Sequence, residues 1–115
     1  MKINCFEEII AWQKTRKLTV TLYELMKNNR DYSFRDQLLR SSVSIMNNIA
    51  EGFERHGDKE FRHFLFIAKG SCGEVRSMLY LANDLNYTLG VNFTELFNQT
   101  LEISKLLSGL IKTLQ

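Results

Sequence analysis

The residues with the clearest potential for chemistry are two histidines and the carboxylates near them. Glu60 precedes His63 by three residues, and a Glu-x-x-His pair on each of two helices is part of the ligand set of di-iron bundles. The other histidine, His56, has no glutamate three residues before it. Because the ligand set is incomplete, we predict no metal site and read this face as a solvated helix surface.

Nucleophilic and ribonuclease chemistry also lack their partners. Arg55 and His63 lie farther apart than the arginine and histidine of the motif that some helical ribonucleases use. No serine or cysteine has a convincing base, and no glycine-rich loop follows a strand pattern. We predict no catalytic residues, no cofactor and no enzymatic activity.

Cysteine usage and hydropathy indicate the compartment. Cys5 and Cys72 are too few for a disulfide framework or a metal cluster, and free thiols are typical of a reducing cytosol. The longest purely apolar runs, such as residues 64–68, are far shorter than the roughly 20 residues that span a bilayer. Early carboxylates interrupt any signal-peptide core. We predict a cytoplasmic protein that does not enter a membrane.

A polar stripe is the most unusual feature of the chain. It lies in the run SSVSIMNNIAEG, residues 41–52, where a helical wheel at about 100° per residue places it beside the apolar face. A second run, Gly70-Ser71-Cys72-Gly73-Glu74, puts two glycines inside the next helix, at about 1 kcal/mol each relative to alanine. Small residues on facing helices permit close approach, so we interpret both runs as halves of one seam.

The seam has two interpretations. It is either a structural hydrogen-bond network between two helices or a surface that contacts a ligand or partner. Partly buried carboxylates need hydrogen-bond partners, and either arrangement would supply them. Its predicted members are Ser44, Asn48, Glu51, Arg55, Ser71 and Glu74.

Basic side chains gather in two places, on the first helix and around the turn between the second and third. Fifteen basic groups against 13 acidic ones give a net charge of +2, which is too balanced for a dedicated nucleic-acid binder. Binding to an RNA or DNA backbone therefore needs local patches, which an oligomer would multiply. The predicted contacts are Lys14, Arg16, Lys17, Arg55, Lys59 and Arg62.

Helices must position these groups. The 115 residues contain no proline and only six glycines, which favours long uninterrupted helices. Apolar residues recur at spacings of three and four, and this pattern predicts helices over residues 6–27, 34–55, 59–86 and 93–114. The predicted N-terminal caps are Ser33, Asp58 and Asn92.

One domain over residues 1–115 accommodates these helices. Loops of a few residues force sequential helices to run antiparallel, so we predict an all-α, antiparallel up-and-down four-helix bundle. The alternative is two helical hairpins exchanged between subunits. Six aromatic residues belong either to the core or to subunit contacts, where aromatics are enriched. They are Trp12, Tyr23, Tyr80, Tyr87, Phe93 and Phe97.

Four motifs, in order and spacing over nearly the whole chain, resemble the 23S ribosomal RNA intervening-sequence protein family, also called the S23 or four-helix-bundle protein family. The signature is Ser44-Ile45-x-x-Asn48-Ile49-Ala50-Glu51-Gly52. The other three are Phe6-Glu7-x-x-x-x-Trp12-Gln13, Gln37-Leu38-x-Arg40-Ser41-Ser42 and Phe61-x-x-Phe64-Leu65-x-Ile67-Ala68-x-Gly70-Ser71-x-x-Glu74.

The resemblance implies an antiparallel four-helix bundle that assembles as a ring-shaped homopentamer. It also implies similarity to accessory proteins of diversity-generating retroelements, which are basic pentamers that bind nucleic acid and a reverse transcriptase. Two functional hypotheses follow. The first is a non-enzymatic oligomeric scaffold that binds RNA or DNA through basic patches. The second is a protein-interaction module that binds a partner or small ligand through the polar stripe, without a nucleic-acid role.

Overall fold

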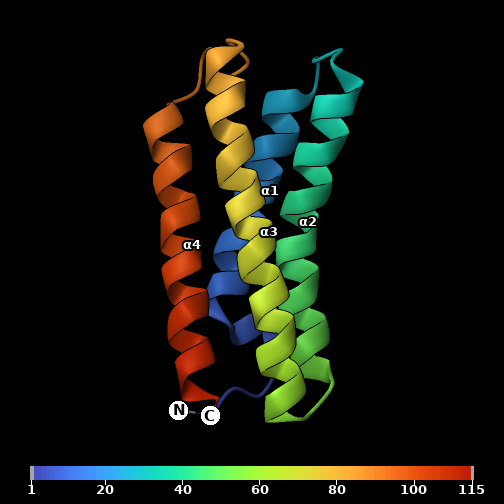
Figure 1. The fold of residues 1–115 in the computed structure, drawn as a ribbon, viewed down its shortest axis with the longest axis vertical. Helices are drawn as coiled ribbons and strands as arrows, with labels where there is room; N and C mark the ends of the chain where they lie inside the picture. Colours follow the sequence, from blue (N-terminus) through green and yellow to red (C-terminus); the bar gives the residue numbers. More distant parts are fainter. Residues whose placement is uncertain (1, 115) are drawn as a thin grey trace.

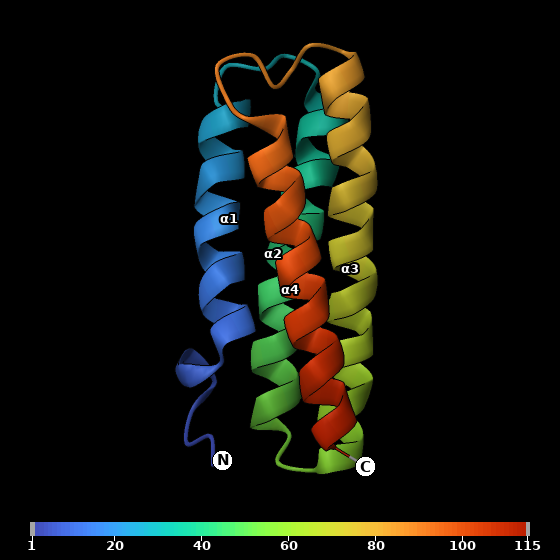
Figure 2. The same ribbon diagram turned by 90° about the vertical axis from the view of Figure 1, so that its left-hand side faces the viewer.

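Four long helices run up and down along one axis in the computed structural model, which describes residues 2–114. After a 3-10 turn, η1 (Phe6–Glu8), the helices are α1 (Ile10–Met26), α2 (Tyr32–Glu54), α3 (Asp58–Asp84) and α4 (Phe93–Thr113). Figures 1 and 2 show both termini at the same end of the bundle as the α2–α3 turn. The predicted antiparallel up-and-down four-helix bundle is confirmed.

The helices form a four-cornered bundle of 42 × 23 × 19 Å. Each helix packs on the next in the sequence, and α4 closes the bundle against α1. Apolar side chains at spacings of three and four turn inward from every helix. The largest fully buried ones form the core: Leu18, Leu22, Met26, Leu38, Ile45, Ile49, Leu65, Val75, Leu79, Leu96, Ile103 and Leu107.

The first helix begins later than the sequence predicts. Residues 6–8 form the separate turn η1, and Ile9 is extended, with φ −75° and ψ 118°. Ile9 is buried, and the Gln13 side chain donates to the carbonyl oxygen of Glu7 at 2.7 Å. This break packs η1 beside the start of α1, against α1 and α2, so the prediction of one helix from residue 6 was wrong.

Two of the three predicted caps were also wrong. Asp31, not Ser33, caps α2, because its carboxylate accepts from the backbone N–H of Phe34 at 3.2 Å. Asp58 is the first residue of α3 and Gly57 its N-cap, although an early carboxylate still favours the positive end of the helix dipole. The third cap is confirmed, since the Asn92 side chain accepts from the backbone N–H of Glu95 at 3.1 Å.

A side-chain contact joins the two loops at the end opposite the termini. The Tyr87 hydroxyl donates to the Asp31 carboxylate at 2.7 Å, and its ring packs edge-on against Phe34 at 5.3 Å. The hydrogen bond to Asp31, together with desolvation, raises the pKa of Tyr87. The same carboxylate therefore caps α2 and accepts from the α3–α4 loop.

Candidate functional site

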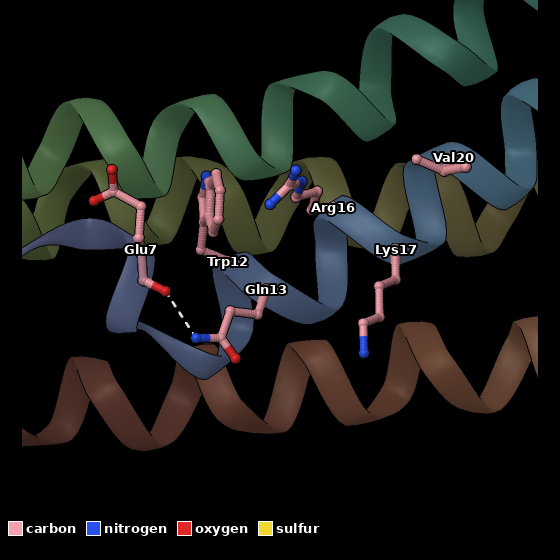
Figure 3. A pocket seen from close by; sticks show the side chains of 6 residues that line it. All are labelled: Glu7, Trp12, Gln13, Arg16, Lys17 and Val20. Carbon is pink, nitrogen blue, oxygen red and sulfur yellow. Dashed lines mark hydrogen bonds between the residues drawn. The ribbon is translucent and has the colours of Figure 1, made fainter.

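A hollow of about 530 Å³ lies on the outer surface of α1 near its start. Trp12 is half-buried there, held edge-on by Phe6 at 5.1 Å, and the Arg16 guanidinium lies over its ring at 5.6 Å. Figure 3 shows Trp12 and Arg16 side by side on the α2 side of α1, while Lys17 points toward α4. The hollow therefore combines an aromatic ring with cationic groups, which suits a flat anionic ligand.

The three predicted basic residues of α1 differ in their partners. Lys14 forms an ion pair with Glu102 of α4 at 3.3 Å, and Arg16 stacks on Trp12. Within residues 2–114, no carboxylate lies within ion-pair distance of Arg16 or Lys17. Two of the three charges therefore remain available to a ligand.

One of the three predicted basic residues at the α2–α3 turn is neutralised by its own neighbours. Arg55 donates to Glu51 at 2.8 Å and to Glu60 at 3.3 Å, and the hydrogen bond to Glu51 leads the effects that raise its pKa. The Arg62 guanidinium lies over the Phe66 ring at 5.2 Å. Lys59 is exposed and has no carboxylate at ion-pair distance among the described residues. The turn therefore keeps two predicted cations without a carboxylate at ion-pair distance among the described residues, Lys59 and Arg62, but they lie close in sequence to the acidic residues Asp58 and Glu60.

Three of the six predicted seam residues come together between α2 and α3. The hydroxyls of Ser44 and Ser71 lie 3.0 Å apart, and the Asn48 amide donates to the Ser44 carbonyl at 2.8 Å and to its hydroxyl at 3.0 Å. Glu74 does not join them, because it accepts from Gln37 at 2.7 Å. The hydroxyls and the amide nitrogen are therefore engaged within the chain.

The close approach of α2 and α3 occurs at a different glycine from those expected. A Cβ added to Gly70 or Gly73 would meet nothing within 4 Å, so these glycines do not bring the helices together. A Cβ on Gly52 would lie 2.6 Å from the Cβ of Phe64 and 3.1 Å from the Phe61 ring. The last residue of the polar run is the one that must lack a side chain.

A buried polar contact between α1 and α2 has no counterpart in the predictions. The Thr19 hydroxyl lies 2.7 Å from that of Ser42 and also donates to the Thr15 carbonyl at 2.8 Å. Ser42 belongs to the polar run, but it lies inside the bundle. The signal in the sequence is the threonine pair at a spacing of four, on the buried face of α1.

A second hollow, of about 500 Å³, lies farther along the same face, between α1 and α2. It too was missed, because its basic residues come from α2 and from the end of α1 instead of forming a run. One signal in the sequence could have linked the two hollows. Five side chains of α1 recur at spacings of three or four, which keeps them on one face of the helix: Trp12, Arg16, Val20, Tyr23 and Lys27. The second hollow is lined by Tyr23, Met26, Lys27, Arg35, Asp36, Leu39 and Arg40.

The Glu60–His63 pair considered as a metal site is not part of a ligand cluster among the described residues. Across the residues that the structure describes, no three His, Cys, Asp or Glu side chains are grouped so that they could hold a metal ion. Glu60 pairs with Arg55, and His63 packs edge-on against Phe64 at 5.8 Å. No helix within the described part of the chain is long and apolar enough to cross a membrane.

Comparisons with known proteins place the chain by sequence and by fold. The profile of the 23S rRNA-intervening sequence protein family matches residues 7–109. A crystal structure described as a protein with unknown function from the S23 ribosomal protein family, from Bacteroides thetaiotaomicron VPI-5482, superposes with a TM-score of 0.81 at 27% identity, over 90% of this chain and 96% of that one. No match was found among curated proteins.

Proposed function

The chain belongs to the 23S rRNA-intervening sequence protein family, and from this we propose that it is a non-enzymatic scaffold that self-assembles and binds the backbone of RNA or DNA. One observation carries the nucleic-acid part. Arg16 and Lys17 line an open hollow and have no carboxylate at ion-pair distance among the described residues. Unpaired cations on an exposed helix attract phosphates and release their condensed counterions.

Self-assembly makes a modest local charge useful. Each neutralised phosphate adds a counterion-release increment, so several copies that present one patch each act as a single polyelectrolyte surface. The outer face of α3 supports assembly, because four large apolar side chains there are 40–48% exposed. They are Phe66, Ile67, Leu81 and Leu85. A ring of five copies is the assembly that the resemblance implies.

Gel-shift titration of the wild-type protein with RNA and DNA tests the binding, at about 50 and 200 mM salt. We expect binding at low salt that weakens steeply at the higher salt. Replacing Arg16 and Lys17 by alanine removes two cations, so the slope of log K against log salt should fall by about 1 to 2. Absence of any shift at low salt by the assembled protein would reject the proposal.

A matched control separates a local patch from net charge. Lys69 lies on α3 and Lys105 on α4, and neither lines the hollow at Trp12. The double variant Lys69→Ala, Lys105→Ala lowers the net charge equally, and it should bind nearly as tightly as the wild type. Light scattering on the same samples tests self-assembly, and a monomer at micromolar concentration would contradict it.

A further inference from the structure

The two hollows lie one after the other along α1, and we propose that together they act as one groove that binds single-stranded nucleic acid, with bases stacked at Trp12 and Tyr23. This inference rests on the proposed function and adds the site and the form of the ligand. Along α1, the stripe from Trp12 to Lys27 occupies an arc of roughly 80° and a length of about 22 Å. Val20 ends the first hollow and Tyr23 begins the second, less than one turn later.

Charge favours an anionic ligand in this groove. Five cationic side chains line it against two carboxylates, Glu7 and Asp36. This excess is larger than the net charge of +2 of the whole chain, so the remaining surface is slightly acidic. Asp36 lies 3.5 Å from Arg35, so this pair neutralises itself and leaves four cations against the carboxylate of Glu7. The five cations are Arg16, Lys17, Lys27, Arg35 and Arg40.

Aromatic rings at both halves of the groove favour unpaired bases. The Tyr23 side chain is 51% exposed, and no other ring packs against it among the described residues. Trp12 is held at its edge by Phe6 and covered by Arg16, so a base entering the first hollow stacks on this Arg16–Trp12 pair. Stacking on exposed rings is open to single strands, whereas duplex bases are stacked on one another.

The geometry fits a short strand. Trp12 and Tyr23 lie 11 residues apart, which is about 16 Å along the helix axis and equals roughly five nucleotides at the 3.4 Å rise of a stacked strand. A probe of about 12 nucleotides therefore covers both rings and the flanking cations. Because stacking tolerates any base, we expect little sequence preference.

Fluorescence anisotropy with a labelled oligouridine of about 12 nucleotides and a duplex of the same length tests the inference on the wild-type protein. We expect tighter binding of the single strand. Tyr23→Ala should weaken that binding by about 5- to 150-fold, the range expected for one lost base stack. Tyr23→Phe keeps the ring and should bind like the wild type.

The control variant is Tyr80→Ala. Tyr80 on α3 is 54% exposed, slightly more than Tyr23, and lines neither hollow. Its loss should leave single-strand affinity within about twofold. Melting curves and light scattering on each variant show that fold and assembly are intact.

The outcomes separate this inference from the proposed function. Equal affinity for single strand and duplex, or wild-type affinity in Tyr23→Ala, overturns the single-strand site and leaves backbone binding standing. Competition by a polyglutamate peptide as strong as that by unlabelled oligouridine also overturns it, since the groove would then recognise acidic chains in general. No binding of either nucleic acid rejects both proposals.

Discussion

Gly52→Ala should disturb the packing of α2 against α3 more than its single added carbon suggests. The new Cβ would lie 2.6 Å from the Cβ of Phe64, whereas carbon atoms pack best at about 3.5–4.0 Å. The Phe64 Cβ is fixed to the backbone of α3, so no rotamer change moves it away. The two helices must therefore separate by about 1 Å at this point.

The magnitude follows from two opposing effects. Overpacking a close helix contact costs about 1–3 kcal/mol, and replacing a helical glycine by alanine recovers about 0.5–1 kcal/mol. We expect a net loss of about 1–2 kcal/mol, which lowers the melting temperature of a domain of this size by about 3–10 °C. Thermal unfolding followed by far-ultraviolet circular dichroism measures this change.

Gly109→Ala in α4 is the matched control. A Cβ there meets nothing within 4 Å, so only the helix-propensity gain remains and the melting temperature should rise by a few degrees. If Gly52→Ala proves as stable as the wild type while Gly109→Ala behaves as expected, α2 and α3 do not approach closely at Gly52, and our account of their packing is wrong.

Three further predictions concern the polar seam, the loop contact and the thiols. Asn48→Leu should lower stability by about 1 kcal/mol and leave nucleic-acid binding unchanged; lost binding with an unchanged melting temperature would place the stripe at a functional surface. The hydrogen bond to Asp31 raises the pKa of Tyr87 above its ordinary value of 10.0. The stability that this hydrogen bond contributes is therefore complete below pH 10 and is lost as the pH rises through the raised pKa. The melting-temperature difference between wild type and Tyr87→Phe should accordingly stay constant from neutral pH to about pH 9 and shrink above pH 10; a difference that grows with alkaline pH would refute this sign. Burial raises the pKa of Cys72 to about 11, so a thiol reagent at pH 8 should modify Cys5 first and reach Cys72 only after unfolding; equal rates for both thiols in the native protein would contradict the buried position.

The sequence predicted the number and direction of the helices because apolar spacing and the lack of proline act over whole segments. It failed at residues that tertiary contacts decide. The break at Ile9 depends on packing of η1 against α1 and α2. At the start of α2, Asp31 and Ser33 are both favourable N-cap residues, and Asp31 alone also contacts Tyr87, 56 positions away in the chain. Neither influence appears in a local pattern.

The candidate site was predicted in part. Arg16 and Lys17 were identified because they are neighbours in the sequence. The cations of the second hollow were missed because they come from α2 and from the end of α1. Arg55 was chosen for its charge, yet the fold pairs it with two carboxylates, one of them on α3. The pair with Glu60 depends on how the turn folds, so a count of charges along the chain does not reveal it.

Trp12 is the only tryptophan in the chain, so its emission reports directly on the groove that we assign to nucleic acid. Titration of the wild-type protein with unlabelled oligouridine of about 12 nucleotides, at about 50 mM salt, should quench this emission saturably, and raising the salt to about 200 mM should reverse the quenching. Emission that stays constant while an independent assay shows the RNA bound would place the binding site elsewhere and contradict the account.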